Sequence, residues 1–187
     1  RHTLFPYTTL FRSYRDDLSK YSTVKPQLIE YTDILIIGSG ATGFSAALEA
    51  ASRDIKIIMV EKMPIPGGNS QLAAGGMNAA GTPYQLKLGI KDSPELMYND
   101  TMKGGKNIAN PKLVKILAEK SAESIKWLAD QNAVLDHVGQ GGGASVPRMH
   151  GPSSGSFAGP YLSAFFREQV KNQNNIELRL NSMVVRL

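Results

Sequence analysis

Residues 33–82 decide the fold, and they read DILIIGSGATGFSAALEAASRDIKIIMVEKMPIPGGNSQLAAGGMNAAGT. An apolar run at 34–37 ends at the glycine-rich segment 38–43. A helical segment of small residues follows, and a second apolar run at 55–60 ends at Glu61. This order predicts a strand, a tight turn, a helix and a second strand. It is typical of a βαβ unit that binds a dinucleotide, with an acidic residue closing the second strand.

The glycines of this turn have separate physical roles. Gly38 lets the chain leave the strand in a tight turn, and Gly40, which has no Cβ, lets a pyrophosphate approach the backbone. Gly43 and Ala47 let the helix sit close to the sheet. The helix is expected over 44–52, and its first N–H groups have no partner within the helix. Its N-terminus therefore favours an anion such as a pyrophosphate.

Glu61 stands where a carboxylate can accept hydrogen bonds from both ribose hydroxyls of an adenosine. The same negative charge disfavours a 2′-phosphate and therefore NADP. An ordinary βα turn without a ligand is the alternative, because glycine-rich turns are common. The glycines between a predicted strand and a predicted helix, with the acid at the expected distance, favour the dinucleotide site.

The second half of the stretch distinguishes FAD from NAD. The prolines of 64–66 break secondary structure, and 67–70 and 73–76 are two further loops of tiny side chains. An NAD domain, the weaker alternative, has no need for these loops, whereas a flat tricyclic ring lying against the backbone does. Backbone N–H groups and the side chains of Asn69 and Ser70 can bond the pyrophosphate and the ring edge.

Three segments carry a family resemblance: GSGATGFSAALEA (38–50), MVEKMPIPGGNSQLAAGGMNAA (59–80) and DSPELMYNDTMKGGKNIANP (92–111). They resemble the flavoprotein domain of the soluble fumarate reductases and flavocytochromes c, within the wider family of succinate dehydrogenase and fumarate reductase flavoproteins. The resemblance runs from about residue 32 to the last residue. Residues 92–105 narrow it to the flavocytochrome c branch, which also contains urocanate and other enoate reductases.

The resemblance implies an α/β fold, namely a Rossmann-like FAD-binding domain with a parallel sheet and added helices, truncated at its C-terminus and without the capping domain. FAD is the implied cofactor. The implied reaction is reduction of the C=C bond of a small unsaturated carboxylate, such as fumarate, by hydride transfer from reduced flavin. The alternatives are another enoate reductase of the urocanate type and a non-catalytic, truncated nucleotide-binding fragment.

No catalytic residue is assigned, because the family's catalytic arginine and carboxylate clamp lie in the capping domain and the C-terminal half. The electron donor is not indicated. Arg148 and Arg167 are the spare cations of this chain, and neither matches a catalytic position of the family.

The resemblance also implies the cofactor-binding residues. Thr42 falls where the family touches the pyrophosphate, and Ala74 and Gly75 fall in the loop under the isoalloxazine. Gly75 is also the implied substrate-binding residue, because its position abuts the bound dicarboxylate. Met183, in the final strand, falls where the backbone meets the adenine. The full implied set is Gly38, Gly40, Thr42, Gly43, Glu61, Lys62, Gly68, Asn69, Ser70, Ala74, Gly75 and Met183.

Three departures from the family pattern lie outside the core FAD positions. Residues 150–152 read His-Gly-Pro where the family has His-Arg-Pro, Asp54 replaces a glycine before the second strand, and Pro160 interrupts a glycine-rich segment. We expect His150 to cap or fill a loop; facing the flavin is the alternative. No cluster of Asp, Glu or His has the spacing of metal ligands, so no metal site is expected.

Further elements are expected after the motif region. Ser93-Pro94 and Asn110-Pro111 each pair a helix N-cap with proline at the first helical position. The second of these helices should run to about Asp130, with Trp127 flanking an apolar stripe of Leu113, Leu117, Ile125 and Leu128. A helix over 161–171 should then lead into a strand over 176–180 that continues through Met183 to 185 and joins the parallel sheet.

Composition bounds the remaining function classes. The 187 residues suffice for one domain with a real core, and the absence of cysteine excludes disulfides, thiolate metal sites and c-type haem attachment in this chain. The sequence contains no Lys/Arg cluster with interleaved aromatic residues, so it gives little support for nucleic-acid binding. No apolar run is long enough to cross a bilayer, so a soluble protein, cytoplasmic or exported, is expected rather than an integral membrane protein.

The N-terminal residues are interpreted separately. Residues 1–13 resemble a translated sequencing adapter and are expected to be an assembly artefact. Without them the net charge falls from +5 to +3, so the basic character is weak support for an anionic partner. Residues 14–31 are expected to be a linker, and 32–187 the N-terminal part of an FAD-binding domain.

Overall fold

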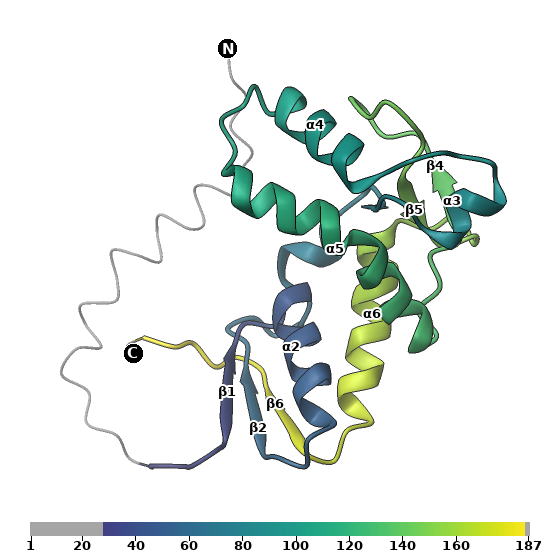
Figure 1. Cartoon of the computed structure of the whole chain (residues 1–187). Helices are drawn as coiled ribbons and strands as arrows, with labels where there is room; N and C mark the ends of the chain where they lie inside the picture. The colour runs from purple at the N-terminus through teal and green to yellow at the C-terminus, as the bar shows by residue number, and fades with distance from the viewer. Residues whose placement is uncertain (1–27, 186–187) are drawn as a thin grey trace.

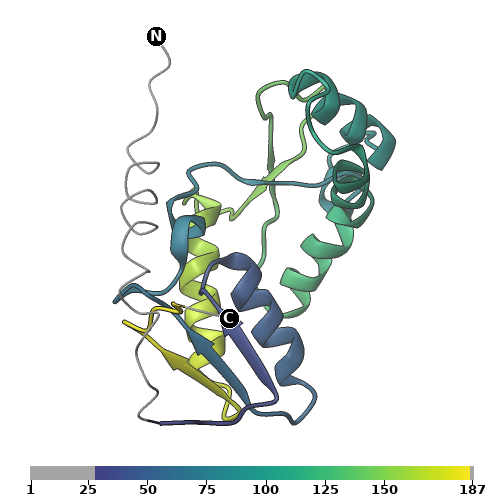
Figure 2. The ribbon, with the colours of Figure 1, turned by 90° about the vertical axis from the view of Figure 1, so that its left-hand side faces the viewer.

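The computed structural model describes residues 28–185, which form a half built on a parallel sheet and a half built on an antiparallel sheet (Figure 1). Residues 1–13 and most of the linker expected over 14–31 lie outside the described residues. A view from the side shows two helices against the parallel sheet and the remaining helices gathered at the other end of the molecule (Figure 2).

The parallel sheet contains β1 (Ile34–Ile37), β2 (Ile57–Val60) and β6 (Ile176–Arg179), in the order β1-β2-β6. Both neighbouring pairs are parallel, so the carboxyl ends of all three strands meet at one edge. The predicted α/β class and parallel sheet are confirmed. Ligands of open α/β sheets bind at this edge.

Helices α2 (Ala41–Ala51) and α6 (Ala158–Lys171) lie side by side on one face of the parallel sheet (Figure 1). The rings of Phe44 and Phe166 stack between them, with centroids 5.8 Å apart. Ala47, a residue of α2, is fully buried, as the small-residue pattern of that helix predicts. The main core cluster, to which residues of both halves contribute, consists of Ile36, Phe44, Ala47, Ala50, Ile57, Met59, Ala79, Ile125, Leu128, Ala133, Leu135, Phe166 and Val170.

Both helices begin three residues earlier than the sequence predicts, at Ala41 and Ala158. Gly40 is the N-cap of α2, so the last residues of the glycine-rich motif already form its first helical turn. Pro160 lies in the first turn of α6, where an amide N–H has no intrahelical acceptor, and it therefore does not interrupt the helix.

Two strand boundaries also differ from the prediction. β2 begins at Ile57 rather than at residue 55, after Asp54 has turned the chain with φ +50°. β6 ends at Arg179, and Asn181 turns the chain with φ +52°. The prediction that Met183 lies in the final strand is therefore wrong, because this residue follows the turn.

The second half contains three helices and a small antiparallel sheet of order β3-β5-β4. Its elements are β3 (Met77–Asn78), α3 (Pro83–Lys87), α4 (Pro94–Gly104), α5 (Pro111–Asp130), β4 (His137–Gly139) and β5 (Met149–Gly151). The predicted starts of α4 and α5 are confirmed. The Ser93 hydroxyl accepts from the Leu96 amide, and the Asn110 side chain accepts from the Lys112 amide.

The predicted apolar stripe of α5 is correct only in its C-terminal half. Ile125 and Leu128 are buried, whereas Leu113 and Leu117 are 65% and 55% exposed. The buried positions of α5 are Val114, Ala118, Ser121, Ile125 and Leu128. Small residues lie at the contact with α4 because they allow close approach. Ser121 is buried there because its hydroxyl accepts a hydrogen bond from the Ala80 amide.

A buried polar network holds β5 in place. Arg148 is 2% exposed and pairs with Asp92 at 3.0 Å and Asp100 at 2.9 Å, so it is not the spare cation that the sequence suggests. His150 is fully buried, with Nδ1 2.8 Å from the Arg148 carbonyl oxygen and Nε2 2.7 Å from Thr82 Oγ1. The prediction that His150 caps or fills a loop is wrong, because this residue is the buried centre of strand β5. Its burial lowers the pKa of the ring below the ordinary 6.5.

Over residues 28–185, none of the helices is long and apolar enough to cross a membrane. The same residues contain no group of three or more His, Asp or Glu side chains that could hold a metal ion.

Candidate functional site

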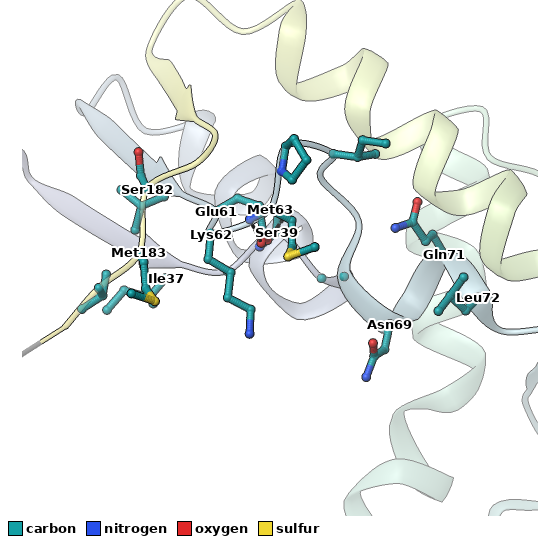
Figure 3. A pocket seen from close by; sticks show the side chains of 17 residues that line it. Ile37, Ser39, Glu61, Lys62, Met63, Asn69, Gln71, Leu72, Ser182 and Met183 are labelled. Carbon is teal, nitrogen blue, oxygen red and sulfur yellow. Dashed lines mark hydrogen bonds between the residues drawn. The ribbon is translucent and has the colours of Figure 1, made fainter. Parts of the chain in front are cut away.

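A cavity of about 670 Å³ lies at the carboxyl ends of β1 and β2 (Figure 3). Its walls come from the turn after β1, the loop after β2, the 3-10 helix η2 (Gly68–Leu72) and the segment after β6. The lining residues are Ile37, Gly38, Ser39, Gly40, Val60, Glu61, Lys62, Met63, Pro64, Ile65, Gly68, Asn69, Gln71, Leu72, Ser182, Met183 and Val184.

The turn after β1 has the geometry that its glycines predict. Gly38 has φ +92°, in the region that favours glycine. A Cβ on Gly43 would lie 2.0 Å from the Gly38 carbonyl oxygen, so only glycine allows the helix this close to the strand. At Gly40, φ is −66° and a Cβ would lie 3.7 Å from the nearest atom, Ser70 Oγ. The protein alone therefore does not require glycine at position 40.

The start of α2 borders the cavity through its N-cap residue, Gly40. Gly40 has no side-chain cap, and the first turn contains no acidic residue. The Ala41 amide donates to Ser70 Oγ at 3.0 Å, which joins α2 to η2. Among the described residues, the amides of Thr42 and Gly43 donate to no protein acceptor. Unpaired N–H groups at the positive end of an 11-residue helix form a site suited to an anion.

Glu61, the residue after β2, is 5% exposed and lines the cavity. Its Oε2 accepts from the Ser39 amide at 2.9 Å and from the Ser39 hydroxyl at 2.6 Å, and its Oε1 accepts from the Met63 amide at 2.9 Å. Burial raises the pKa of the Glu61 carboxyl, but these hydrogen bonds outweigh burial and lower the pKa below the ordinary 4.5. The side chain is thus a carboxylate at neutral pH.

The loop after β2 differs from its prediction. The sequence predicts a loop over 67–70, but Gly67 is the N-cap of η2 and 68–70 form its first part, with φ +127° at Gly67 and +52° at Gly68. Glycine permits this entry into a 3-10 helix because its positive φ costs little. Lys62 and Asn69 both line the cavity, and their side chains point to the same side in the view of Figure 3.

The segment after β6 reaches the cavity through hydrogen bonds to the end of β2. The Ser182 amide donates to the Glu61 carbonyl at 2.8 Å, and the Asn181 amide donates to the Met63 carbonyl at 3.3 Å. Met183 consequently lies beside Ile37 at the cavity wall (Figure 3). Met183 therefore lines the cavity although it does not lie in the predicted strand, and its contact with the adenine stays a prediction.

The structure gathers most of the predicted site residues in one place. Seven line the cavity: Gly38, Gly40, Glu61, Lys62, Gly68, Asn69 and Met183. Thr42, Gly43 and Ser70 adjoin it from α2 and η2. Ala74 and Gly75 are exposed and lie further along the chain, outside the lining.

Sequence reasoning missed Ser39, whose hydroxyl bonds Glu61 and accepts from the Gly67 amide at 3.0 Å. The middle position of a glycine-rich turn carries no signal for this role, since many residue types occur there. Met63, Gln71 and Ser182 were missed as well, because they line the cavity only through the fold.

With this geometry in view, comparison with known proteins identifies the family. Residues 33–187 match the family described as "FAD binding domain". The chain belongs to this family. Its cofactor is FAD, as its sequence motifs predict.

The similar proteins include fumarate reductases. The chain is 48% identical over 151 residues to fumarate reductase (cytochrome) of Shewanella frigidimarina, covering 80% of this chain and 26% of that protein. It superposes on the open conformation of a flavocytochrome c3 fumarate reductase with a TM-score of 0.82 at 42% identity, covering 92% of this chain and 30% of that one. A urocanate reductase of Eggerthella lenta is 34% identical over 96 residues, covering 51% of this chain and 16% of that protein.

The predicted resemblance to the flavocytochrome c branch is thereby confirmed. The chain spans 26% to 30% of the length of the two fumarate reductases.

Proposed function

We propose that this chain forms the FAD-binding part of an enzyme that reduces the C=C bond of a small unsaturated carboxylate of the fumarate type. The observation that carries its FAD-binding role is the cavity, which is lined by Gly40 at the start of α2 and by Glu61 after β2. The reaction class rests on the identity with fumarate reductase (cytochrome).

The cavity fits the cofactor. Its volume of about 670 Å³ lies within the usual range of ligand pockets, roughly 300–1,000 Å³. Gly40, which the protein alone does not require, leaves the backbone open to a pyrophosphate at the amides of Thr42 and Gly43. Glu61 Oε1 accepts only one hydrogen bond from the protein, so its remaining lone pair suits a ribose hydroxyl, and the backbone beside Met183 suits the adenine.

The remaining predicted residues extend the site from the pyrophosphate toward the flavin. Lys62 adds positive charge at the cavity. Gly68, Asn69 and Ser70 lie in the first turn of η2 and would contact the pyrophosphate. Ala74 and Gly75 continue this surface as the seat of the flavin ring, and Gly75 adjoins the substrate.

When bound, FAD supplies the hydride for the alkene; the chain binds and orients it. Of the two arginines that the sequence leaves without a role, Arg148 is buried between two aspartates, and Arg167 donates from Nε to the Ser163 carbonyl of its own helix. We assign the catalytic acid and the carboxylate clamp to segments that the fumarate reductases contain and this chain does not cover.

A urocanate-type enoate reductase is the second candidate, because the urocanate reductase matches across half of this chain. The deciding experiment expresses the complete reading frame that contains this chain and measures oxidation of a reduced dye with fumarate or urocanate supplied. Fumarate-dependent oxidation is expected. Turnover of urocanate alone would favour the second candidate, and a flavin-loaded protein inactive with both would contradict the proposal.

A further inference from the structure

The first turn of α6 is bonded to the loop that precedes β3. The Ala158 amide donates to the Gly75 carbonyl oxygen at 3.1 Å, and the Gly159 amide donates to the Ala73 carbonyl oxygen at 3.2 Å. These are N–H groups that have no acceptor within their own helix. Two of the free donors of α6 are therefore used to hold the loop formed by residues 73–76.

The orientation of these two carbonyls sets the direction of two amides. The described peptide bonds are all trans, and the C=O and N–H of a trans peptide point in opposite directions. The Ala73 carbonyl shares its peptide with the Ala74 amide, and the Gly75 carbonyl shares its peptide with the Gly76 amide. Both N–H groups consequently point away from α6.

Neither of these amides donates to another group within residues 28–185. Ala74 and Gly75 are exposed, and Gly76 is half-buried against β5, where a Cβ would lie 2.4 Å from the His150 carbonyl oxygen. The loop is thus clamped from two sides, by α6 and by β5, while two parallel donors remain free on its open side.

Gly159 makes this contact possible. A Cβ on Gly159 would lie 2.4 Å from the Ser70 carbonyl oxygen, 2.6 Å from the Ala73 carbonyl oxygen and 2.8 Å from the Ala73 nitrogen. All three are backbone atoms, so a larger residue would displace both η2 and the loop. The positive end of the 14-residue α6 also polarises the bonded peptides, which strengthens their outward N–H groups as donors.

We propose that the first turn of α6, with Gly159 as its positioning residue, orients and polarises the amides of Ala74 and Gly76 as a pair of hydrogen-bond donors to the flavin ring of FAD. This inference rests on the proposed function, in which residues 74–75 seat the ring. It adds a role for α6, an element that lies outside the cavity lining.

The main test compares Gly159→Ala with Gly142→Ala in the full chain. Gly142 is a suitable control, because a Cβ there meets nothing within 4 Å and its φ is not in the left-handed region. FAD affinity is measured by quenching of flavin fluorescence, and the midpoint potential of the bound flavin is measured at saturating FAD. Thermal unfolding without FAD reports whether each variant folds.

Gly159→Ala is expected to weaken FAD binding about tenfold or more and to lower the flavin midpoint potential, because fewer aligned donors stabilise the electron-rich reduced ring. Gly142→Ala should match the wild type in both properties. Wild-type affinity and potential in a folded Gly159→Ala protein would overturn the inference. Failure of the wild-type chain itself to bind FAD would instead contradict the proposed cofactor role of this chain.

A second variant keeps the inference testable if Gly159→Ala does not fold. Ala158 is the first helical residue of α6, a position that tolerates proline, and Phe157 before it already has extended backbone angles. Ala158→Pro removes the N–H that bonds Gly75, whereas Ala158→Ser retains it. A lowered flavin potential in the proline variant alone is expected, and equal potentials in both variants would overturn the inference.

Discussion

At the scale of single residues, the site depends on a carboxylate that has two tasks. Glu61 binds the turn through the Ser39 amide and hydroxyl, and it binds its own loop through the Met63 amide. In the proposed complex the same oxygens also accept from the ribose. The sequence motif predicts only the second task, because hydrogen bonds within the empty turn depend on the fold.

Replacing this carboxylate should therefore affect both binding and stability. For Glu61→Ala, we expect FAD binding to weaken by about 1.5–3 kcal/mol, roughly tenfold or more in affinity, because a charge-assisted hydrogen bond is lost. The buried Ser39 amide also loses its acceptor, so the melting temperature should fall as well. Equilibrium titration and thermal unfolding measure the two effects. Glu119→Ala on exposed α5 is the control, and equal FAD affinity in both variants would show that Glu61 is not a ligand.

His150 makes stability depend on pH. Because burial lowers its pKa below 6.5, the folded protein binds fewer protons there than the unfolded chain does. Its contribution to stability is complete above pH 6.5 and is lost as the pH falls through the lower pKa of the folded state. We expect the free energy of unfolding to decrease as the pH falls below 6.5, and His150→Gln to flatten that decrease. An unchanged slope in the variant would assign the dependence to another group.

At the scale of elements, local sequence patterns predict the βαβ unit because each pattern there favours one local backbone conformation. Glycine at a positive φ, proline after an N-cap and consecutive β-branched residues act within a few positions. The errors occur where tertiary contacts decide. The face of α5 that is buried follows Ala118 and Ser121, which give no hydrophobic signal, and β6 ends where Asn181 turns back toward Met63.

The corrected face of α5 gives a paired test. Ala118 is 2% exposed at the contact with α4, so Ala118→Leu should destabilise the fold by about 1–3 kcal/mol through overpacking. Leu117 is 55% exposed, and Leu117→Ala should change the free energy of unfolding by only about 0.5 kcal/mol. Chemical denaturation measures both. A larger loss of stability in Leu117→Ala than in Ala118→Leu would indicate that the apolar stripe predicted from the sequence is the buried face of α5.

At the scale of the whole molecule, the described residues contain the seat for a cofactor but no assembled reaction site. Arg148 is buried between two aspartates and Arg167 donates to its own helix, and the sheet face opposite α2 leaves Leu35 and Ile37 51% and 49% exposed. Exposed apolar surface of this kind favours aggregation and weak retention of flavin.

We accordingly expect this chain by itself to reduce no fumarate, even with FAD and a strong reductant supplied. Hydride transfer needs the alkene held against the flavin, with a proton donor at the other carbon. A reduced-dye assay of the chain beside the product of the complete reading frame measures this. Turnover by the chain near the rate of the complete protein would mean that a catalytic acid has been overlooked within it.

The central claim is that FAD binds at the carboxyl ends of β1 and β2, and amide NMR of the isotope-labelled chain tests it most directly. Adding FAD should shift the backbone amide signals of residues 38–43, 61–62 and 68–70, and ADP should shift the first two groups. Signals of α4, on the far side of the molecule, should stay in place (Figure 1). Shifts confined to other elements, or none at FAD concentrations that saturate binding, would contradict the account.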